Sequence, residues 1–489
     1  MKYDAIVIGA GANGLVAAHL LAKAGRKVVV LERQAGDDGA LDTGWVPPRL
    51  ATELALPGLA VRRPDPWIAV ALADGGRLEL SQDLARSVEA IRRVSPKDAA
   101  RWPAFCERMH RLAGFLEALY GAPPPDIESR NLGELFRLAL LGARARRMGK
   151  QAVVDLLRVP PMSAAELLDE WFVSDALKGA LGAGAVLHLR QGPRSGGTAF
   201  VLLHHHVGSL SGVFRPPRSN LRQVLAGLAA VEVRRGAAVL RITVQDGRAG
   251  GVVLANGDEL SAPLVVSGAD PRATLLGLVE PGWLDPEFAH AVRNIKCRGV
   301  AARVTLAVDR DPGFATLAVA PSLEYLERAY DDAKYGRVSA SPYLEARAED
   351  HRVDVHVQYA PYALADGGWD DGRRRALGNA VIERLALHAP ALGPSVTRCE
   401  VLTPRELEER QGLTEGNAYH GELTLDQILF MRPVAGWGRY RTPIRGLWLC
   451  GAGTHPGGAI AGGAGRLAAR EILKGGASAR TRPFPPART

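Results

Sequence analysis

The chain has 489 residues, of which 47% are hydrophobic and 23% charged, a composition typical of globular proteins and not of disordered chains. This length suggests two or three domains, or one large body with an inserted part. The formal net charge is +9, and only nine of the 61 basic residues are lysines. We expect no nucleic-acid partner, and we leave open a weak attraction to anionic lipid.

Cysteine usage excludes two classes of site. Cys106, Cys297, Cys399 and Cys450 lie far apart, so the chain contains neither a redox-active dithiol nor a zinc ribbon. A disulfide framework is not expected, which fits a reducing cytoplasm. No signal peptide precedes the first strand, and no apolar run reaches ~18 residues. We therefore expect a cytoplasmic protein, with peripheral membrane contact left open.

The first forty residues predict a βαβ unit. Residues 5–8 form a short apolar run of β-formers, read as a buried parallel strand. A glycine-rich turn follows at 9–14, and the amphipathic stretch 15–25 then reads as a helix that stops at a glycine. Residues 28–31 form a second apolar strand, which ends at Glu32.

The glycine spacing in this unit predicts dinucleotide binding. Gly9 permits the tight turn, Gly11 lets the backbone approach a pyrophosphate, and Gly14 lets the helix pack close to the strand. The helix N-terminus offers free N–H groups and a partial positive charge to phosphates. Glu32, at the end of the second strand, is placed to hold ribose hydroxyls.

The residues after Glu32 indicate FAD rather than NAD. Arg33, Gly39, Ala40 and the residues around them resemble the second glycine motif of FAD oxidoreductases, and the resemblance implies that these three contact FAD. The first glycine of that motif is replaced by Asp38, whose carboxylate either repels the pyrophosphate or turns outward.

A second strand–turn–helix unit closes the chain. The apolar strand 447–450 runs into a glycine-rich turn over 451–465, and residues 466–473 have helical spacing. Small residues let a backbone lie against a flat ring, and a helix N-terminus aimed at the N1/O2 edge of a flavin stabilises the anionic reduced form. The residues expected to contact the flavin here are Gly451, Gly453, Gly457, Gly458, Ala459 and Ile460.

Together, the two ends resemble the phytoene desaturase-like FAD oxidoreductases, for which the stretch 451–458 is specific. Within that family the chain looks most similar to bacterial relatives of pyridine nucleotide-disulfide oxidoreductase domain-containing protein 2, and the resemblance spans nearly the whole chain. It implies an α/β fold, with a discontinuous Rossmann-type FAD-binding domain and a mixed α+β substrate domain. It also implies that Val239 lies by the adenine and that Ser267 and Gly268 pass near the FAD.

The expected organisation alternates between the two domains. A β-meander with turns at 246–247 and 256–257 should return the chain to the nucleotide domain. Residues 216–220 depart from the family pattern at the border of the expected substrate cavity. The predicted parts are 1–75 (FAD domain, first part), 76–215 (helical substrate domain), 216–295 (FAD domain, second part), 296–425 (substrate domain), 426–475 (closing motif) and 476–489 (a frayed tail).

Histidines are the candidate catalytic residues. On a strand, His204 and His206 would share one face and His205 the other, which supplies too few ligands for a metal site, so no metal is expected. His205 is a candidate cavity-lining group, with plain packing as the alternative. His420 is a candidate flavin- or substrate-facing group, with a structural role in the turn as the alternative.

Four further features each have two interpretations. His455 positions the backbone or transfers a proton, and Arg432 lies near the flavin or on the surface. Cys450 is a buried strand residue, or it attaches the flavin covalently. Leu135, Phe136, Leu138 and Leu141 precede a basic cluster, Arg144–Lys150, and this segment is either a solvated helix end or a membrane contact.

The sequence therefore predicts an FAD-dependent oxidoreductase that takes a hydride from a C–H bond of an apolar or amine-type small molecule. Its electrons would pass to oxygen, a quinone or another acceptor. Two alternatives stay open: a redox-neutral isomerase that uses reduced FAD, and a flavin-binding interaction protein without turnover. The oligomeric state is left open.

Overall fold

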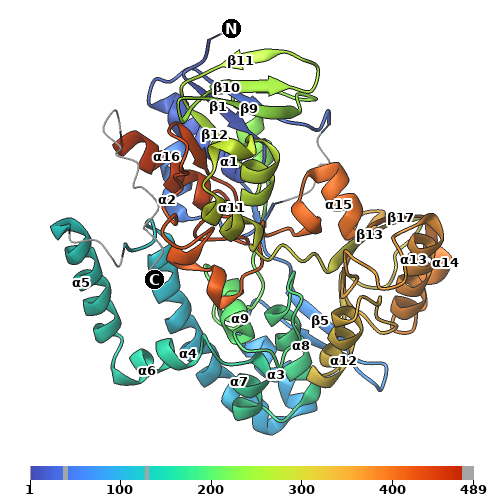
Figure 1. The fold of residues 1–489 in the computed structure, drawn as a ribbon. Helices are drawn as coiled ribbons and strands as arrows, with labels where there is room; N and C mark the ends of the chain where they lie inside the picture. The colour runs from blue at the N-terminus through green and yellow to red at the C-terminus, as the bar shows by residue number, and fades with distance from the viewer. Residues whose placement is uncertain (1, 37–41, 127–130, 476–489) are drawn as a thin grey trace.

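A parallel sheet assembled from distant parts of the chain forms the upper part of the molecule (Figure 1). The structure is a computed structural model that describes residues 2–36, 42–126 and 131–475. The five strands are ordered β18-β12-β1-β2-β8 and all pair in parallel. They span β1 (Ala5–Ile8), β2 (Val28–Leu31), β8 (Glu232–Arg234), β12 (Val265–Ser267) and β18 (Leu447–Leu449).

Both faces of this sheet are covered, as a parallel sheet requires. Helices α1 (Ala12–Lys23) and α16 (Gly463–Lys474) pack side by side on one face (Figure 1). A Cβ on Gly465 would overlap the Asn13 carbonyl oxygen, so glycine is what lets the two helices approach. The two ends of the chain thus build one layered unit.

A three-stranded antiparallel meander covers the other face (Figure 1). Its strands are β9 (Val239–Gln245), β10 (Arg248–Leu254) and β11 (Glu259–Ser261). Asp246 and Gly247 join the first two with φ values of 50° and 68°, as a tight hairpin with two left-handed residues requires. The meander expected from the sequence is present, and both of its turns lie where the sequence places them.

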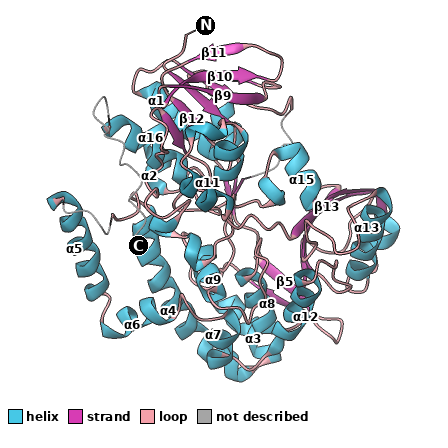
Figure 2. Ribbon diagram, in the orientation of Figure 1, coloured by secondary structure: helices cyan, strands magenta, loops and turns pink. Residues whose placement is uncertain are grey.

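A seven-stranded mixed sheet forms the second half of the molecule, ordered β17-β13-β16-β15-β14-β5-β6. One face packs against α13 (Asp371–Ala386), and the β5 end lies near a group of helices drawn at the bottom of Figure 2. The strands are β5 (Ile68–Ala71), β6 (Arg77–Leu80), β13 (Ala301–Val308), β14 (Thr316–Val319), β15 (Tyr343–Glu349), β16 (Arg352–Gln358) and β17 (Val396–Leu402).

Short elements and helices complete the fold. A small sheet joins β3 (Asp42–Thr43), β7 (Arg218–Ser219) and β4 (Val61–Arg62). The remaining helices are α2 (Pro48–Leu54), α3 (Leu84–Val94), α4 (Pro96–Tyr120), α5 (Leu132–Arg147), α6 (Lys150–Arg158), α7 (Ala164–Trp171), α8 (Asp175–Ala185), α9 (Thr198–His206), α10 (Leu221–Ala226), α11 (Pro286–Arg293), α12 (Leu323–Lys334), α14 (Leu392–Ser395) and α15 (Pro404–Gln411). Single helical turns occupy Ala273–Gly277, Pro281–Trp283, Thr414–Gly416, Leu425–Gln427 and Leu429–Met431.

The three consecutive histidines lie on helix α9, so the prediction that they occupy a strand is wrong. Every residue of α9 is buried, and a short run that is buried all round carries no periodicity to separate helix from strand. On a helix, successive side chains point about 100° apart, so the three rings meet different partners.

Helix α5 has no buried residue and stands with α6 at the edge of the molecule (Figure 1). Among the described helices, none combines the length and the apolar character needed to cross a bilayer.

Candidate functional site

The first glycine turn ends in a row of free backbone donors. Gly9 has a φ of 92°, and a Cβ on Gly14 would overlap the Gly9 carbonyl oxygen. In contrast, a Cβ on Gly11 would meet nothing within 4 Å. The N–H groups of residues 11–14, at the N-terminus of α1, have no acceptor within the described chain. Open space beside unpaired donors is what a pyrophosphate needs.

Glu32 lies directly beside this turn. Its Oε2 accepts a hydrogen bond from Ala10 N at 2.8 Å, and its Oε1 accepts one from Gln34 N at 2.9 Å. The Ala237 N–H donates to the Glu32 carbonyl at 2.8 Å, which brings the start of β9, and therefore Val239, close to Glu32. The structure thus gathers the residues expected around the ribose and adenine at one edge of the sheet.

Arg33 points elsewhere. Its Nη2 donates to the Glu409 carbonyl at 2.6 Å, and its guanidinium lies against Gly412, so it links β2 to α15. The other expected contacts of this motif, Gly39 and Ala40, lie outside the described residues, as does Asp38.

Small residues let the closing turn dock on the return strand. Gly268 N donates to the Ile8 carbonyl at 2.7 Å and follows Ser267, whose register partner in β1 is Ile8. A Cβ on Gly451 would overlap the Gly268 carbonyl oxygen, and one on Gly453 would overlap the Pro271 ring. The predicted contacts at 267–268 and 451–453 therefore lie side by side.

The closing turn presents buried donors that lack acceptors. The N–H groups of Gly458, Ala459 and Ile460 have no hydrogen-bond partner among the described residues, and all three residues are buried. The carbonyls are satisfied: Gly458 O accepts from His204, and Ala459 O accepts from Trp45 N at 2.9 Å. Buried donors without partners are costly, so this turn fits a ligand with acceptors on one edge, such as the N1/O2 edge of a flavin. The residues present therefore fit FAD.

Helix α16 begins at Gly463, three residues after Ile460, and its Gly465 N–H donates to Asn13 Oδ1 at 3.2 Å. The helix expected to aim at the flavin thus starts beside the N-terminus of α1. The unpaired donors nearest the turn belong to its own backbone.

His204 holds the closing turn in place. The Gly458 carbonyl can only accept, so His204 Nε2 carries the proton and donates to that oxygen at 2.8 Å. The other ring nitrogen, Nδ1, accepts from the Tyr120 hydroxyl at 2.8 Å. Burial lowers the pKa of this imidazole to about 4, so it is neutral near pH 7.

His205 supports the side of the turn away from α16. Its Nδ1–H donates to the Gly184 carbonyl at 2.8 Å, so Nε2 accepts from the Tyr419 hydroxyl at 2.8 Å. The Tyr419 ring lies so close to Gly458 that a Cβ there would overlap it. Burial lowers the pKa of His205 to about 3. His205 is thus a buried positioning residue, and it reaches the turn through Tyr419.

No sequence motif marks Tyr419 as a site residue. Its ring also contacts His188, with ring centroids 4.8 Å apart, and His188 in turn contacts His356 at 4.9 Å. The only signal for this cluster was that Tyr419 precedes His420, which had been singled out. His188 lies in the loop between α8 and α9, His356 lies in β16, and Tyr419 lies in the loop after Thr414–Gly416, so only tertiary packing brings them together.

His206 completes the trio, and its Nδ1–H donates to the Val213 carbonyl at 2.6 Å while its ring stacks on Phe214. The three rings thus have three separate sets of partners. Within the described residues, no group of three or more His, Cys, Asp or Glu side chains could hold a metal ion.

His420 lies at the other side of the closing turn, with a left-handed φ of 56°. Its carbonyl oxygen lies 3.0 Å from the position of a Cβ on Gly453, and its Nδ1 is buried without a partner. Burial lowers the pKa of the imidazole, and the Asp270 carboxylate opposes that shift. An unpartnered ring nitrogen beside the turn keeps His420 as a candidate ligand-facing group.

Arg432 and His455 tie loops together. Arg432 is 2% exposed, and its guanidinium donates to the carbonyls of Tyr419, Gly421 and Ala452 at 2.5–3.0 Å. It is therefore a buried clamp between residues 419–421 and the closing motif, and the interpretation as a surface arginine is wrong. The His455 Nε2 lies 3.3 Å from the Leu119 carbonyl, which anchors the same motif to α4.

All four cysteines are free. Cys450 is buried at the end of β18, where its N–H donates to Ser267 O at 2.7 Å. Burial raises the pKa of its thiol to about 12, so the thiol stays protonated near pH 7.

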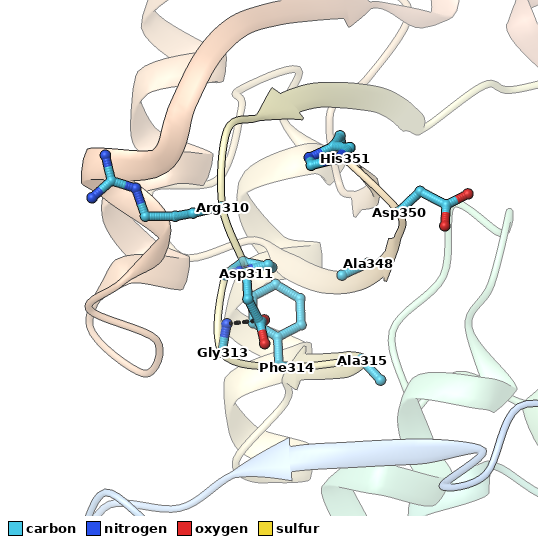
Figure 3. Close-up of a pocket in the computed structure, with 9 residues that line it drawn as sticks. Arg310, Asp311, Gly313, Phe314, Ala315, Ala348, Asp350 and His351 are labelled. Carbon is cyan, nitrogen blue, oxygen red and sulfur yellow. Dashed lines mark hydrogen bonds between the residues drawn. The ribbon is translucent and has the colours of Figure 1, made fainter.

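An open depression lies among the loops of the seven-stranded sheet, between Arg310, Asp311 and His351 (Figure 3). Asp311 Oδ1 accepts from Gly313 N at 2.8 Å, so this carboxylate closes its own turn. The depression contains none of the predicted site residues.

Comparisons with known proteins match nearly the whole chain. A sequence model of a family described as FAD dependent oxidoreductase matches residues 4–185. Pyridine nucleotide-disulfide oxidoreductase domain-containing protein 2 of Rattus norvegicus is 32% identical, with 97% of this chain and 94% of that protein covered. Hydroxyneurosporene desaturase of Cereibacter sphaeroides is 27% identical, with 96% and 97% covered. The solved structure of putrescine oxidase bound to putrescine shares the fold, with a TM-score of 0.59, 16% identity, and 97% and 99% covered.

Proposed function

We propose that this chain, which belongs to the phytoene desaturase-like family of FAD-dependent oxidoreductases, takes a hydride from a C–H bond of an apolar or amine-type small molecule. The family expected from the glycine motifs is thereby confirmed, and FAD is its cofactor. FAD supplies the hydride acceptor when bound, and the electrons then pass to oxygen, a quinone or another acceptor.

One observation carries the proposal. The three buried N–H groups of residues 458–460 have no acceptor among the described residues, and neither do the N–H groups of the first glycine turn. Donors fixed before the reaction stabilise negative charge without reorganising. His204 and Arg432 hold this turn through carbonyl groups, and so keep its N–H groups aimed at the ligand.

The relatives support the substrate class. One is named a desaturase of hydroxyneurosporene, and one solved structure holds putrescine. Beside the closing turn of this chain, the rings of Tyr419, His188 and His356 form a cluster whose imidazoles are kept neutral by burial. A neutral aromatic surface suits an apolar chain or an uncharged amine.

The test is anaerobic mixing of the purified protein with a substrate panel while its absorption near ~450 nm is followed. Net bleaching by a substrate supports the dehydrogenase. Product formation without net bleaching identifies a redox-neutral isomerase. A protein that holds FAD and shows neither response to any ligand is a flavin-binding partner without turnover, and a protein without flavin contradicts the proposal.

Peripheral membrane contact through α5 is the second part of the proposal. Leu132, Leu135, Phe136 and Leu140 recur at helical spacing on one face of α5, where they are 83%, 47%, 64% and 54% exposed. Three arginines follow in the last turn of the helix, at 144, 146 and 147. An exposed apolar stripe that ends in basic residues fits an anionic lipid surface.

Co-sedimentation with vesicles tests this contact. The protein should bind vesicles that contain anionic lipid, and a Phe136→Glu/Leu140→Glu variant should lose most of that binding. A variant with two glutamates on an exposed face elsewhere, Leu387→Glu/Tyr335→Glu, is the control. Equal binding by both variants contradicts the assignment to α5.

A further inference from the structure

A second, narrow pocket lies on the side of the substrate half that borders residues 216–220. Arg63, Trp67, Ser209, Arg215 and Arg347 are among its lining residues, and so are Pro216 and Pro217. This is the stretch in which the sequence departs from its family. The pocket is small, with room for little more than one water-sized group.

Positive charge exceeds negative charge around this pocket. Arg215 and Arg347 share the single carboxylate of Glu345, at 3.1 Å and 2.8 Å. Arg63 forms no ion pair within the described part of the chain. Asp65, next in the chain to the lining residue Pro64, already accepts from Gln82 N and Arg86 Nη1.

Positive charge also exceeds negative charge around nearby Arg218. Burial lowers the pKa of its guanidinium, and the charges of Arg347, Arg303 and Arg62 lower it further, against the opposing effect of Asp354. A group of arginines that weaken one another's protonation is stabilised by an added anion.

Trp67, which lines the pocket, carries a buried hydrogen-bond donor. Trp67 is 1% exposed, and its Nε1–H has no hydrogen-bond partner among the residues that the structure describes. The Arg215 guanidinium lies 5.8 Å from the Trp67 ring, so the indole donor and a fixed cation lie close together. The unpaired Oε1 of Gln82 lines the same pocket and can accept from a water that accompanies an anion.

We propose that this pocket binds the carboxylate end of a small organic acid. A carboxylate has two planar acceptor oxygens, which match an indole N–H and guanidinium donors, and one of its oxygens fits the narrow space.

Contacts between neighbouring residues link the pocket to the closing turn. Arg215 Nη1 lies against Gly184, whose carbonyl accepts from His205, and His205 bonds Tyr419, whose ring covers Gly458. On the other side, Gly208, the neighbour of Ser209, packs on Trp45, which pairs with Ile460. Ligand binding in the pocket can therefore act on the closing turn through these buried contacts; that coupling rests on the proposed function, whereas the binding itself does not.

Calorimetry on the protein as purified, with octanoate as the probe, tests the binding. We expect octanoate to bind, and 1-octanol and octylamine to bind at least tenfold more weakly. Trp67→Phe keeps a ring but removes the donor, and Arg63→Gln removes an exposed cation. Each should weaken octanoate about tenfold, while the matched controls Trp283→Phe and Arg328→Gln leave it unchanged. Melting temperature and FAD content confirm that each variant is folded.

Two results would overturn the carboxylate site: octanol or octylamine binding as tightly as octanoate, or variants at Trp67 and Arg63 that bind octanoate like the wild type. Competition by inorganic phosphate at equal concentration would also overturn the preference for a carboxylate. A flavin difference spectrum that titrates with the calorimetric constant supports the coupling to the closing turn, and an unchanged flavin spectrum refutes it. A protein without flavin refutes the proposed function and leaves the calorimetric result standing.

Discussion

The Tyr419 hydroxyl donates to His205 Nε2 at 2.8 Å, and this bond fixes the ring that covers Gly458. The direction of the bond follows from Gly184, because its carbonyl accepts a hydrogen bond from Nδ1–H and so leaves Nε2 without a proton. His205 therefore acts on the closing turn through Tyr419.

Replacing Tyr419 by Phe should leave the ring in place and the His205 Nε2 buried without a partner. An unpaired buried acceptor costs about 1–3 kcal/mol, so the free energy of unfolding from urea titration should fall by that amount while FAD content is kept. Tyr335→Phe, at a tyrosine that is 60% exposed, should change nothing. Equal stability of the two variants would mean that the bond contributes nothing.

Gly11→Val separates ligand binding from folding. Gly11 has a φ of −67°, which any residue adopts, and the space beside it is open, so the variant should fold as the wild type does. We expect it to purify without FAD, because the side chain occupies the space of the pyrophosphate.

Gly14→Ala is the matched contrast. Its Cβ would overlap the Gly9 carbonyl oxygen, so the melting temperature should fall even in the absence of FAD. Stoichiometric FAD in folded Gly11→Val would remove the assignment of this loop.

Glu32→Gln should weaken FAD binding by about 1–1.5 kcal/mol, or roughly fivefold to tenfold, because a charge-assisted bond to the ribose becomes a neutral one. The single oxygen of Gln can accept from only one of the Ala10 and Gln34 N–H groups, so the melting temperature is measured alongside to show that the variant is folded. Flavin fluorescence gives the dissociation constant. An unchanged constant would mean that another group holds the ribose.

The sequence was most informative where spacing and backbone geometry coincide. Three features could be predicted because each needs small or left-handed residues at set positions: the GxGxxG turn, the closing turn and the hairpin at Asp246–Gly247. Family resemblance extended this to the fold and to FAD.

The neighbours of the site could not be predicted in the same way. Arg432 carries no pattern that separates a buried clamp from a surface arginine, since its partners are carbonyl groups of several loops. Tyr419 reaches His205 across 214 residues of sequence, so only the folded chain brings them together. The helix α9 was mistaken for a strand because burial on all sides removes its periodicity.

Acid should destabilise the protein steeply. Burial lowers the pKa values of His204, His206 and His455 to about 4 and that of His205 to about 3, all below the usual value of 6.5. The unfolded chain therefore binds protons that the folded chain does not, and stability that is fully present above pH 6.5 falls as the pH falls toward 4. Each histidine contributes roughly 1.4 kcal/mol per pH unit in that window.

Urea midpoints between pH 7.5 and 4.5 measure this slope. His206→Gln removes one titrating group, so its slope should be shallower by about one proton. His290→Gln, at an exposed histidine of α11, is the control. An identical slope in wild type and His206→Gln would contradict the prediction.

Ala459→Asp tests whether the closing turn faces the flavin. Ala459 has a φ of 62°, a conformation that Asp tolerates well, so the variant should fold and keep FAD. A carboxylate opposes negative charge that develops at the N1/O2 edge, and a like charge in partly desolvated surroundings is worth ~1–3 kcal/mol. For a two-electron couple this lowers the midpoint potential by about 20–65 mV. Ala459→Asn has the same shape without the charge and should keep the wild-type potential. A spectroelectrochemical titration of the two FAD-loaded variants decides the matter, and equal potentials would mean that the flavin ring lies away from residues 458–460.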